Sequence, residues 1–329
     1  MQSCLSTVKA LADETRLRIL RILMTGTYNV NELVAILSMG QSRVSRHLRI
    51  LSDAGLVRPR RQGTWVYYGL TGLWENESSP GFLPSFADEL SASPLPLAAA
   101  DDRGIKACLG QRRKQAEQFF SSVAERDDSQ RDEIEGPAEH HTIIAELLRC
   151  GGEELGIVVD LGTGTGRLLP LLGESARGVI GIDGAREMLD VARRRCEENG
   201  GPEAELRLGS LEHLPLGDGE ADAMVANMVL HHVANPLDAL REVHRGLVPG
   251  GRFLLADYAA HEFESHREKL GDLWLGFDRD ELAGWLELAG FEIESERELP
   301  GNRRRPGVFV IASNRKQVCK ETSGNGGLV

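Results

Sequence analysis

Apolar residues recur at helical spacing through the start of the chain and then give way to a short strand-like pair. An acidic start at Asp13, with leucines every third position up to Leu23, predicts a core helix. A second helix is predicted at about 30–37 and a third, after a short turn, at about 41–51. Residues 57–68, rich in Thr, Trp, Val and Tyr, predict a hairpin with a basic tip.

The pattern changes further along the chain. Prolines among Ser, Ala and acidic residues at 75–103 predict a linker with little core of its own. Helical spacing at about 105–127 predicts a helix that packs on one of the domains or on a second subunit. Apolar β-branched runs then alternate with helical segments, which predicts a mostly parallel sheet with helices on both faces. The strand candidates are 157–161, 178–182, 204–208, 221–226, 251–257, 291–297 and 307–312.

Charge divides the chain in the same way. The formal net charge of the 329 residues is −12, which taken alone argues against a nucleic-acid partner. Residues 1–73, however, hold ten basic and four acidic side chains, a net charge of +6, so the rest of the chain carries −18. A basic region joined to a strongly acidic body is expected when one domain meets phosphate and the other does not.

Cysteine usage and hydropathy restrict the class of protein. The five cysteines (Cys4, Cys108, Cys150, Cys196 and Cys319) are far apart and form no Cys-x-x-Cys pair, so we expect no disulfide framework. No N-terminal stretch resembles a signal peptide, and no apolar run approaches the roughly 18 residues of a membrane span. We therefore expect a cytoplasmic protein that makes no membrane contact.

The predicted third helix has the pattern of a DNA-reading helix. Val44, Leu48 and Leu51 share an inward face. The polar side chains left on the outside are Gln41, Ser42, Arg43, Ser45, Arg46 and His47. Short hydroxyls suit phosphates, whereas Gln and Arg are long enough to reach base edges in the major groove. Arg60 and Arg61 at the hairpin tip are expected to contact the DNA backbone or minor groove. The alternative is a helical bundle with a solvated basic face.

These residues resemble the ArsR-type winged helix-turn-helix repressors over residues 5–70, above all in 11–20, 41–48 and 51–57. The resemblance implies a homodimer on an imperfect palindrome of double-stranded DNA, with two recognition helices one turn apart. Metal-sensing members place paired cysteines in the helix before the turn, but the matching stretch 29–37 offers no thiolate or imidazole. We therefore expect no metal, and we expect the adjacent His140 and His141 on the surface.

An apolar strand at 157–161 runs into a glycine-rich turn, Gly162-Thr163-Gly164-Thr165-Gly166. Such a turn alone is a weak signal, since many nucleotide-binding folds need one. Asp160 directly before the glycines is an awkward neighbour for phosphate but a good one for a cationic amino-acid group. Asp183 ends the next strand, 23 residues after Asp160, where a carboxylate can accept both ribose hydroxyls.

Together these features resemble class I S-adenosylmethionine-dependent methyltransferases over about 137–313, with support from the segments 208–216, 227–233 and 247–253. The resemblance implies a Rossmann-like, seven-stranded sheet whose last strand is antiparallel. It assigns Asp160 and the loop glycines to the methionine part, Asp183 to the ribose, Met188 and Leu211 to the adenine, and Asn227 to the sulfur side. The full predicted ligand set is Asp160, Gly162, Thr163, Gly164, Gly166, Asp183, Gly184, Met188, Ser210, Leu211, Asn227 and His232. At Ser210 many relatives place an Asp. The alternative is a similar fold that binds another nucleotide or none.

Methyl transfer needs little more than alignment of donor and acceptor, so no nucleophile need be visible. His231, His232, Asp257 and His261 are candidate bases, although a pocket wall or an exposed loop is the favoured role for each. The motifs for DNA amino-methylation, cytosine C5 methylation and arsenite methylation are absent. The sequence leaves a small-molecule acceptor as the open alternative, and residues 261–268 are a candidate cap over the pocket.

The two halves together resemble the fused ArsR–methyltransferase regulators, which respond to S-adenosylhomocysteine and control methionine-cycle genes. The predicted fold is α/β: a winged helix-turn-helix domain at 1–73, a linker and amphipathic helix at 74–136, a methyltransferase-like domain at 137–314 and a frayed tail at 315–329. We expect a transcriptional regulator that senses S-adenosylhomocysteine or S-adenosylmethionine. One alternative is an active small-molecule methyltransferase whose DNA-binding domain autoregulates its operon. Another is that the N-terminal half only mediates dimerisation.

Overall fold

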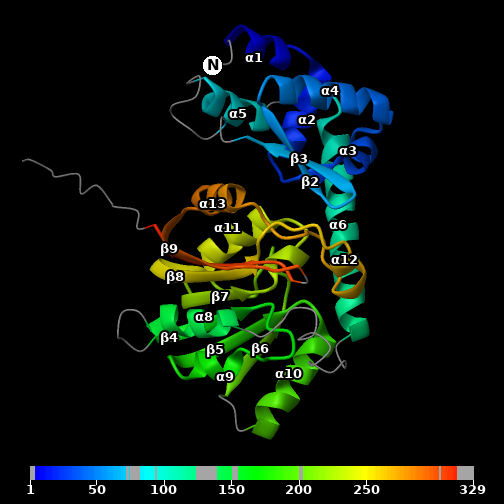
Figure 1. Ribbon diagram of the computed structural model, residues 1–329. Helices are drawn as coiled ribbons and strands as arrows, with labels where there is room; N and C mark the ends of the chain where they lie inside the picture. Colours follow the sequence, from blue (N-terminus) through cyan, green and yellow to red (C-terminus); the bar gives the residue numbers. More distant parts are fainter. Residues whose placement is uncertain are drawn as a thin grey trace, which may run out of the picture.

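The computed structural model contains two halves joined by one long helix (Figure 1). It describes residues 4–71, 74, 82–92, 95–123, 139–149, 155–199, 203–303 and 305–316. Within these residues no helix is long and apolar enough to cross a bilayer.

The N-terminal half is a winged helix. Its elements are α1 (Cys4–Leu11), α2 (Glu14–Leu23), β1 (Tyr28–Asn29), α3 (Val30–Leu37), α4 (Gln41–Asp53), β2 (Val57–Gln62) and β3 (Trp65–Leu70), and the strands form an antiparallel sheet in the order β1-β3-β2. Asp13 caps α2 by accepting from Arg16 N, and Asn29 with Glu32 forms a capping box that starts α3. The predicted helices and hairpin are therefore confirmed.

Part of the predicted linker is helical. Helix α5 (Leu83–Ala92) buries Leu83 and Leu90 in the winged-helix core. The segment can be helical despite its proline, because Pro84 lies in the first turn, where its missing N–H breaks no helical hydrogen bond. Helix α6 (Ala98–Val123) starts seven residues before the predicted helix and packs on α2 and α3. Asp101 at its start forms a buried, bidentate ion pair with Arg18 of α2. The stretch 75–103 is thus only partly a linker; 75–81 and 93–94 lie outside the described residues.

The C-terminal half is built on a seven-stranded sheet. Its elements are α8 (Glu139–Arg149), β4 (Leu155–Leu161), α9 (Leu169–Gly173), β5 (Ala176–Asp183), α10 (Arg186–Asn199), β6 (Ala204–Leu208), β7 (Ala221–Asn227), η2 (Leu230–His232), α11 (Pro236–Gly246), β8 (Leu247–Tyr258), α12 (Ser265–Lys269), α13 (Arg279–Leu288), β9 (Phe291–Leu299) and β10 (Val308–Arg315). The strand order is β6-β5-β4-β7-β8-β10-β9, and β10 is antiparallel to both neighbours. All seven strand candidates and the antiparallel last strand are confirmed.

Side chains alternate between the two faces of this sheet, as the pleat requires. Val158 of β4 packs in a core with α8 and α9, whereas Val159 packs in a core with α11 and α13. The parallel strands β4, β5, β7 and β8 end at the same edge of the sheet. This edge therefore gathers the polar residues Asp160, Asp183 and Asn227, where ligands of such sheets bind.

Candidate functional site

Helix α4 lies on the side of the winged helix away from the C-terminal half (Figure 1), and its polar side chains are exposed to solvent. Val44, Leu48 and Leu51 are fully buried and fix the helix on the core. The exposed side chains are Gln41, Ser42, Arg43, Ser45 and Arg46. Five of the six predicted base-reading or phosphate-contacting residues of this helix are thus accessible to a duplex.

His47 lies differently from its prediction. Its ring is half-buried, and Nδ1 lies 3.7 Å from Oδ1 of Asp13, the cap of α2. Burial lowers the pKa of His47. The ring therefore turns toward the helix that supports α4 rather than outward with its neighbours, because position 47 lies beside the buried stripe of α4.

The wing is docked on the C-terminal half. The Arg60 guanidinium forms an ion pair with Glu281 of α13 and donates to Gly276 O at 2.8 Å. Gln62 is buried and donates to the same carbonyl at 3.3 Å. Arg60 thus faces α13, not an open hairpin tip as predicted, because its partners come from a segment more than 200 residues away. Arg61 is exposed, as predicted.

The turn after β4 has the backbone of a glycine loop. Gly162, Gly164 and Gly166 have φ values of 67°, 53° and 78°, a region that other residues rarely adopt. A Cβ at Gly162 would lie 2.2 Å from the Val229 side chain, so no other residue fits there. The amides of Gly162 and Thr163 donate to Ile182 O, which ties the loop to β5.

Asp160 is a buried carboxylate at the base of this loop, with 2% of its surface exposed. Thr163 Oγ1 donates to it at 2.7 Å, and no basic side chain in the described residues forms an ion pair with it. Burial raises the pKa of Asp160 to about 7. A cationic group of a ligand would stabilise the ionised form, so Asp160 fits the ammonium group of a methionine moiety.

Asp183 clamps the loop from the end of β5. Its two carboxylate oxygens accept from Gly164 N and Ala185 N, each at 2.8 Å, and the side chain is half-buried. A carboxylate oxygen can accept more than one hydrogen bond, so these two bonds do not exclude the predicted ribose role. Gly184 is exposed and Ser210 half-buried.

The predicted adenine contacts lie in different clusters of buried side chains. Met188 is 1% exposed and packs with Ala185, Phe119 and Phe120, whereas Leu211 is 7% exposed and belongs to the main core. The two phenylalanines come from the end of α6. Their place against Met188 was not predicted, because nothing in the sequence says which domain the end of that helix meets.

Two histidines of α8 lie beside Asn227. The Nδ2 of Asn227 is 3.2 Å from Nε2 of His141, and the rings of His140 and His141 contact each other at 4.8 Å. Burial lowers the pKa of His140 to about 4. Both side chains are half-buried, so their prediction as surface residues was wrong: the first turn of α8 lies over the carboxyl end of β7.

Two of the candidate bases form a buried pair. His231 Nδ1 lies 2.7 Å from Oδ1 of Asp257, and both side chains are almost wholly inaccessible. His232 packs edge-on against Phe120 with ring centres 4.6 Å apart. His261 lies in the stretch predicted to cap the pocket, which contains α12, and Gly271 just after α12 lies against Phe119 of α6.

Arg112 of the connecting helix α6 contacts both halves of the molecule. Its buried guanidinium donates to both Glu32 carboxylate oxygens at 2.7 and 2.8 Å and to Thr27 O in the winged helix. It also donates to Ala234 O at 2.9 Å and lies 4.8 Å from the centre of a Trp274 ring in the C-terminal half. The sequence singled out no residue for this role, since the partners are far apart in the chain.

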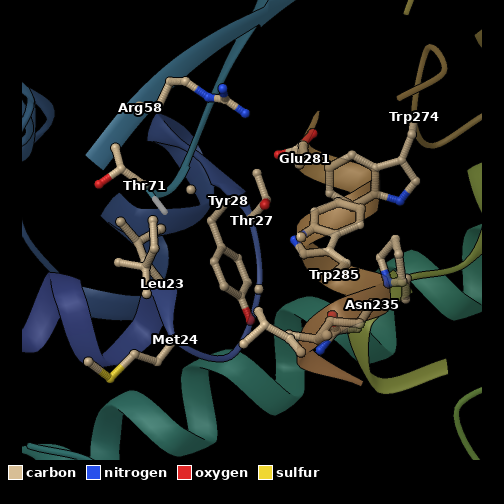
Figure 2. A pocket seen from close by; sticks show the side chains of 18 of the residues that line it. Leu23, Met24, Thr27, Tyr28, Arg58, Thr71, Asn235, Trp274, Glu281 and Trp285 are labelled. Atoms are coloured by element: carbon tan, nitrogen blue, oxygen red, sulfur yellow. The ribbon is translucent and has the colours of Figure 1, made fainter. Parts of the chain in front are cut away.

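The halves meet around a cavity of about 270 Å³, with Arg112 in its wall. Figure 2 shows Leu23 and Tyr28 of the winged helix on one side, facing Trp274, Trp285 and Glu281 on the other. The interface thus combines apolar side chains with the Arg112 and Arg60 ion pairs.

Comparison with known proteins agrees with this geometry. Residues 13–58 match the family model "Bacterial regulatory protein, arsR family", and residues 159–255 match "Methyltransferase domain". A 37.1 kDa protein of transposon TN4556 from Streptomyces fradiae is 42% identical over 109 residues, which are 33% of this chain and 31% of that protein. The Bacillus subtilis methyltransferase YcgJ is 31% identical over 145 residues, which are 39% of this chain and 57% of YcgJ.

Among solved structures, N-methyltransferase NodS from Bradyrhizobium japonicum, in complex with S-adenosylhomocysteine, shares the fold with a TM-score of 0.51. The two are 14% identical, and the match covers 61% of this chain and 98% of NodS. The chain spans 31% to 58% of the length of the first curated relatives. The chain therefore combines an ArsR-family helix-turn-helix with a class I methyltransferase domain, the architecture of a DNA-binding regulator fused to a methyltransferase domain.

Proposed function

We propose that the protein is a DNA-binding transcriptional regulator whose methyltransferase domain binds S-adenosylhomocysteine or S-adenosylmethionine as an effector. Its DNA-contacting residues are Gln41, Ser42, Arg43, Ser45 and Arg46 in the first turns of α4, together with Arg61 of the wing. Leu5 and Val8 of α1, 60% and 48% exposed, form an apolar face suited to a second copy of the chain. Two copies would place two α4 helices on a palindromic operator.

The observation that carries this proposal is that α6 contacts the winged helix at one end and the predicted adenine site at the other. At one end Ile105 and Leu109 are buried in the winged-helix core, and Arg112 holds both halves. At the other end Phe119 and Phe120 pack on Met188, a predicted adenine contact. A ligand that changes the packing at Met188 therefore acts on the helix that supports the DNA-binding half. Only a ligand with unequal affinity for two arrangements of α6 can shift their balance.

The pocket residues suit an adenosyl amino acid. Asp160 is buried without a basic partner among the described residues and so suits an ammonium group. Asp183 suits the ribose, and the glycine loop leaves room beside Gly164, where an added Cβ would have no neighbour closer than 3.9 Å. Bound S-adenosylmethionine would supply an electrophilic methyl group. The chain's own residues bind and orient the ligand, and methionine-cycle genes are the natural targets of such a sensor.

Calorimetry with both adenosyl ligands, followed by a DNA shift assay with each at fixed salt, tests the proposal. The duplex is selected from a random library with the full chain. We expect micromolar or tighter binding of one ligand, a change in operator affinity of 5- to 150-fold, and loss of both effects in Asp160→Asn. Asp218→Asn, which changes an exposed acid far from the loop, is the matched control.

Two outcomes contradict the proposal. Binding of either ligand with unchanged operator affinity would separate the two domains functionally. Turnover of labelled S-adenosylmethionine with a cell extract, lost in Asp160→Asn, would instead identify the chain as a small-molecule methyltransferase.

A further inference from the structure

Histidine side chains surround one buried carboxylate in the methyltransferase domain. Asp272 is 3% exposed, and His231 and His266 are each 2% exposed. The group also includes His232 at the end of η2 and His261. Buried polar groups are normally hydrogen-bonded, so the partners of this carboxylate decide what the group can do.

The hydrogen bonds that this burial requires are missing. Neither carboxylate oxygen of Asp272 has a hydrogen-bond partner. His266 Nδ1 lies 3.3 Å from Oδ2, close enough to attract the carboxylate but without the geometry of a hydrogen bond, and His231 Nε2 and His232 Nδ1 lie 3.7 and 3.9 Å from Oδ1. A cation bound among these groups would give the carboxylate a close partner that the protein atoms do not supply.

The spacing suits a bound ion. Three potential ligand atoms, one each from His231, His232 and Asp272, lie within 4.8 Å of one another. Nitrogen and oxygen ligands at about 2.0–2.2 Å from one zinc ion lie about 3.3–3.6 Å apart in a tetrahedron. The observed separations of 3.7 and 3.9 Å therefore need only small side-chain shifts. His232 Nδ1 would exchange its long contact with Gly271 O, 3.3 Å, for the ion.

Neighbouring groups hold these atoms in the orientation that ligands need. Asp257 Oδ1 lies 2.7 Å from His231 Nδ1, so a proton on Nδ1 leaves the Nε2 lone pair directed at Asp272. Asp257 is itself fixed by the amides of Tyr258 and His231. A carboxylate behind a ligating histidine is a recurrent feature of zinc sites.

His261 and His266 lie on the other side of Asp272. His261 Nδ1 accepts from Phe263 N at 3.2 Å, so the proton of the neutral ring is on Nε2, which makes His261 a donor rather than a ligand. His266 Nδ1 faces the second carboxylate oxygen and can orient it. The ligand side of Asp272 is therefore the side of His231 and His232.

We propose that His231 Nε2, His232 Nδ1 and Asp272 Oδ1 bind one zinc-class divalent ion, with Asp257 and His266 as positioning residues. Two histidines and one carboxylate are the protein ligands of zinc sites that keep an open fourth position. That position would take water or a Lewis-basic group of a small molecule. The sequence predicted no metal, because the ligands come from two segments 40 residues apart and follow no spacing motif.

An ion bound at this site would also connect two segments of the methyltransferase domain. Asp272 belongs to the segment between β8 and α13 that carries the wing: Gly276 O accepts from Arg60 and Gln62, and Glu264 accepts from Thr64 N. An ion would fasten this segment to η2. The inference concerns ion binding alone and does not depend on the adenosyl effector.

Zinc titration of the chelator-stripped full chain, against a chromophoric chelator, tests the proposal. We expect one ion per chain and visible absorption of tetrahedral Co²⁺ when cobalt replaces zinc. His232→Gln and Asp272→Asn should each weaken binding at least 100-fold, and Asp257→Asn and His266→Gln about 10- to 100-fold. His213→Gln, which changes an exposed histidine, should leave it unchanged. Circular dichroism monitors folding. If Asp272→Asn unfolds, His232→Gln, at a half-buried position, provides the test in its place.

The absence of one-to-one binding would overturn the proposal. So would binding that survives His232→Gln but is lost in His261→Gln, since the ion would then lie on the opposite side of Asp272.

Discussion

Helix α4 and the wing are both basic and both were predicted to contact DNA, yet their arginines lie in different surroundings. Arg43 and Arg46 of α4 are exposed, whereas Arg60 of the wing is paired with Glu281 of the methyltransferase domain. Charge along the chain identified both surfaces equally well. Which arginines are accessible to DNA depends on partners that lie 200 residues away and are set by how the domains dock.

The difference gives the two surfaces different roles. In this arrangement of the domains the polar side of helix α4 is accessible to a duplex, whereas the wing is held against the methyltransferase domain. Arg58 and Arg60 both face acidic residues of the α13 region, at Asp278 and Glu281. Under the proposed function, a ligand-dependent movement of this region would release or retain the wing arginines near the duplex.

The largest effect is expected from Arg112→Ala, which removes the side chain that joins the two halves. Arg112→Ala leaves Glu32 half-buried without its partner and two carbonyls without a donor, so the free energy of unfolding should fall by about 3–5 kcal/mol. Urea unfolding measures the change. Lys114→Ala, an exposed position two residues along α6, should change it by less than about 0.5 kcal/mol. Equal effects of the two substitutions would refute the role of Arg112 as the connector.

The exposed surface is tested by Arg43→Ala combined with Arg46→Ala. Loss of two base or phosphate contacts should weaken operator binding by about 2–3 kcal/mol, roughly 30- to 150-fold, and lower the salt slope by about 2. Fluorescence anisotropy over a salt series measures both. Arg49→Ala, exposed further along the same helix, is the control. Unchanged affinity would mean that the N-terminal half only mediates dimerisation.

Protonation of Asp160 should weaken the binding of S-adenosylhomocysteine. Its pKa is raised to about 7 by burial, so the carboxylate is protonated at lower pH and cannot pair with an ammonium group. Affinity for S-adenosylhomocysteine should therefore rise about tenfold per pH unit between pH 5.5 and 7 and level off above. Calorimetry at several pH values measures this, and Asp160→Asn should show no binding at any of them. A flat profile for the unaltered chain would contradict the role of Asp160.

The smallest effect is expected from freeing the wing. Glu281→Ala releases Arg60, so non-specific DNA affinity should rise by about 0.5–1 kcal/mol, two- to fivefold, with a salt slope steeper by about 1. Glu287→Ala, exposed on the same helix, removes the same charge without touching Arg60. If both variants gain equally, the effect comes from net charge and not from the wing.

The sequence predicted regular elements better than contacts between them. All seven strands of the large sheet were located because apolar β-branched runs are a local property. Helix α5 was missed, since Pro84 and its small neighbours resemble a linker until their packing on the winged helix is known. The glycine loop and Asp160 follow a spacing motif, but Arg112 and Asp272 derive their meaning from distant partners that no local pattern encodes.

Titration of S-adenosylhomocysteine into the free chain and into the operator-bound chain tests most directly whether ligand site and DNA-binding surface are coupled. Linkage requires that the ligand and the operator change each other's affinity by the same factor. We predict that the two dissociation constants differ by 5-fold or more, and that the factor equals the ligand's effect on operator affinity. Equal dissociation constants would contradict the coupling through α6.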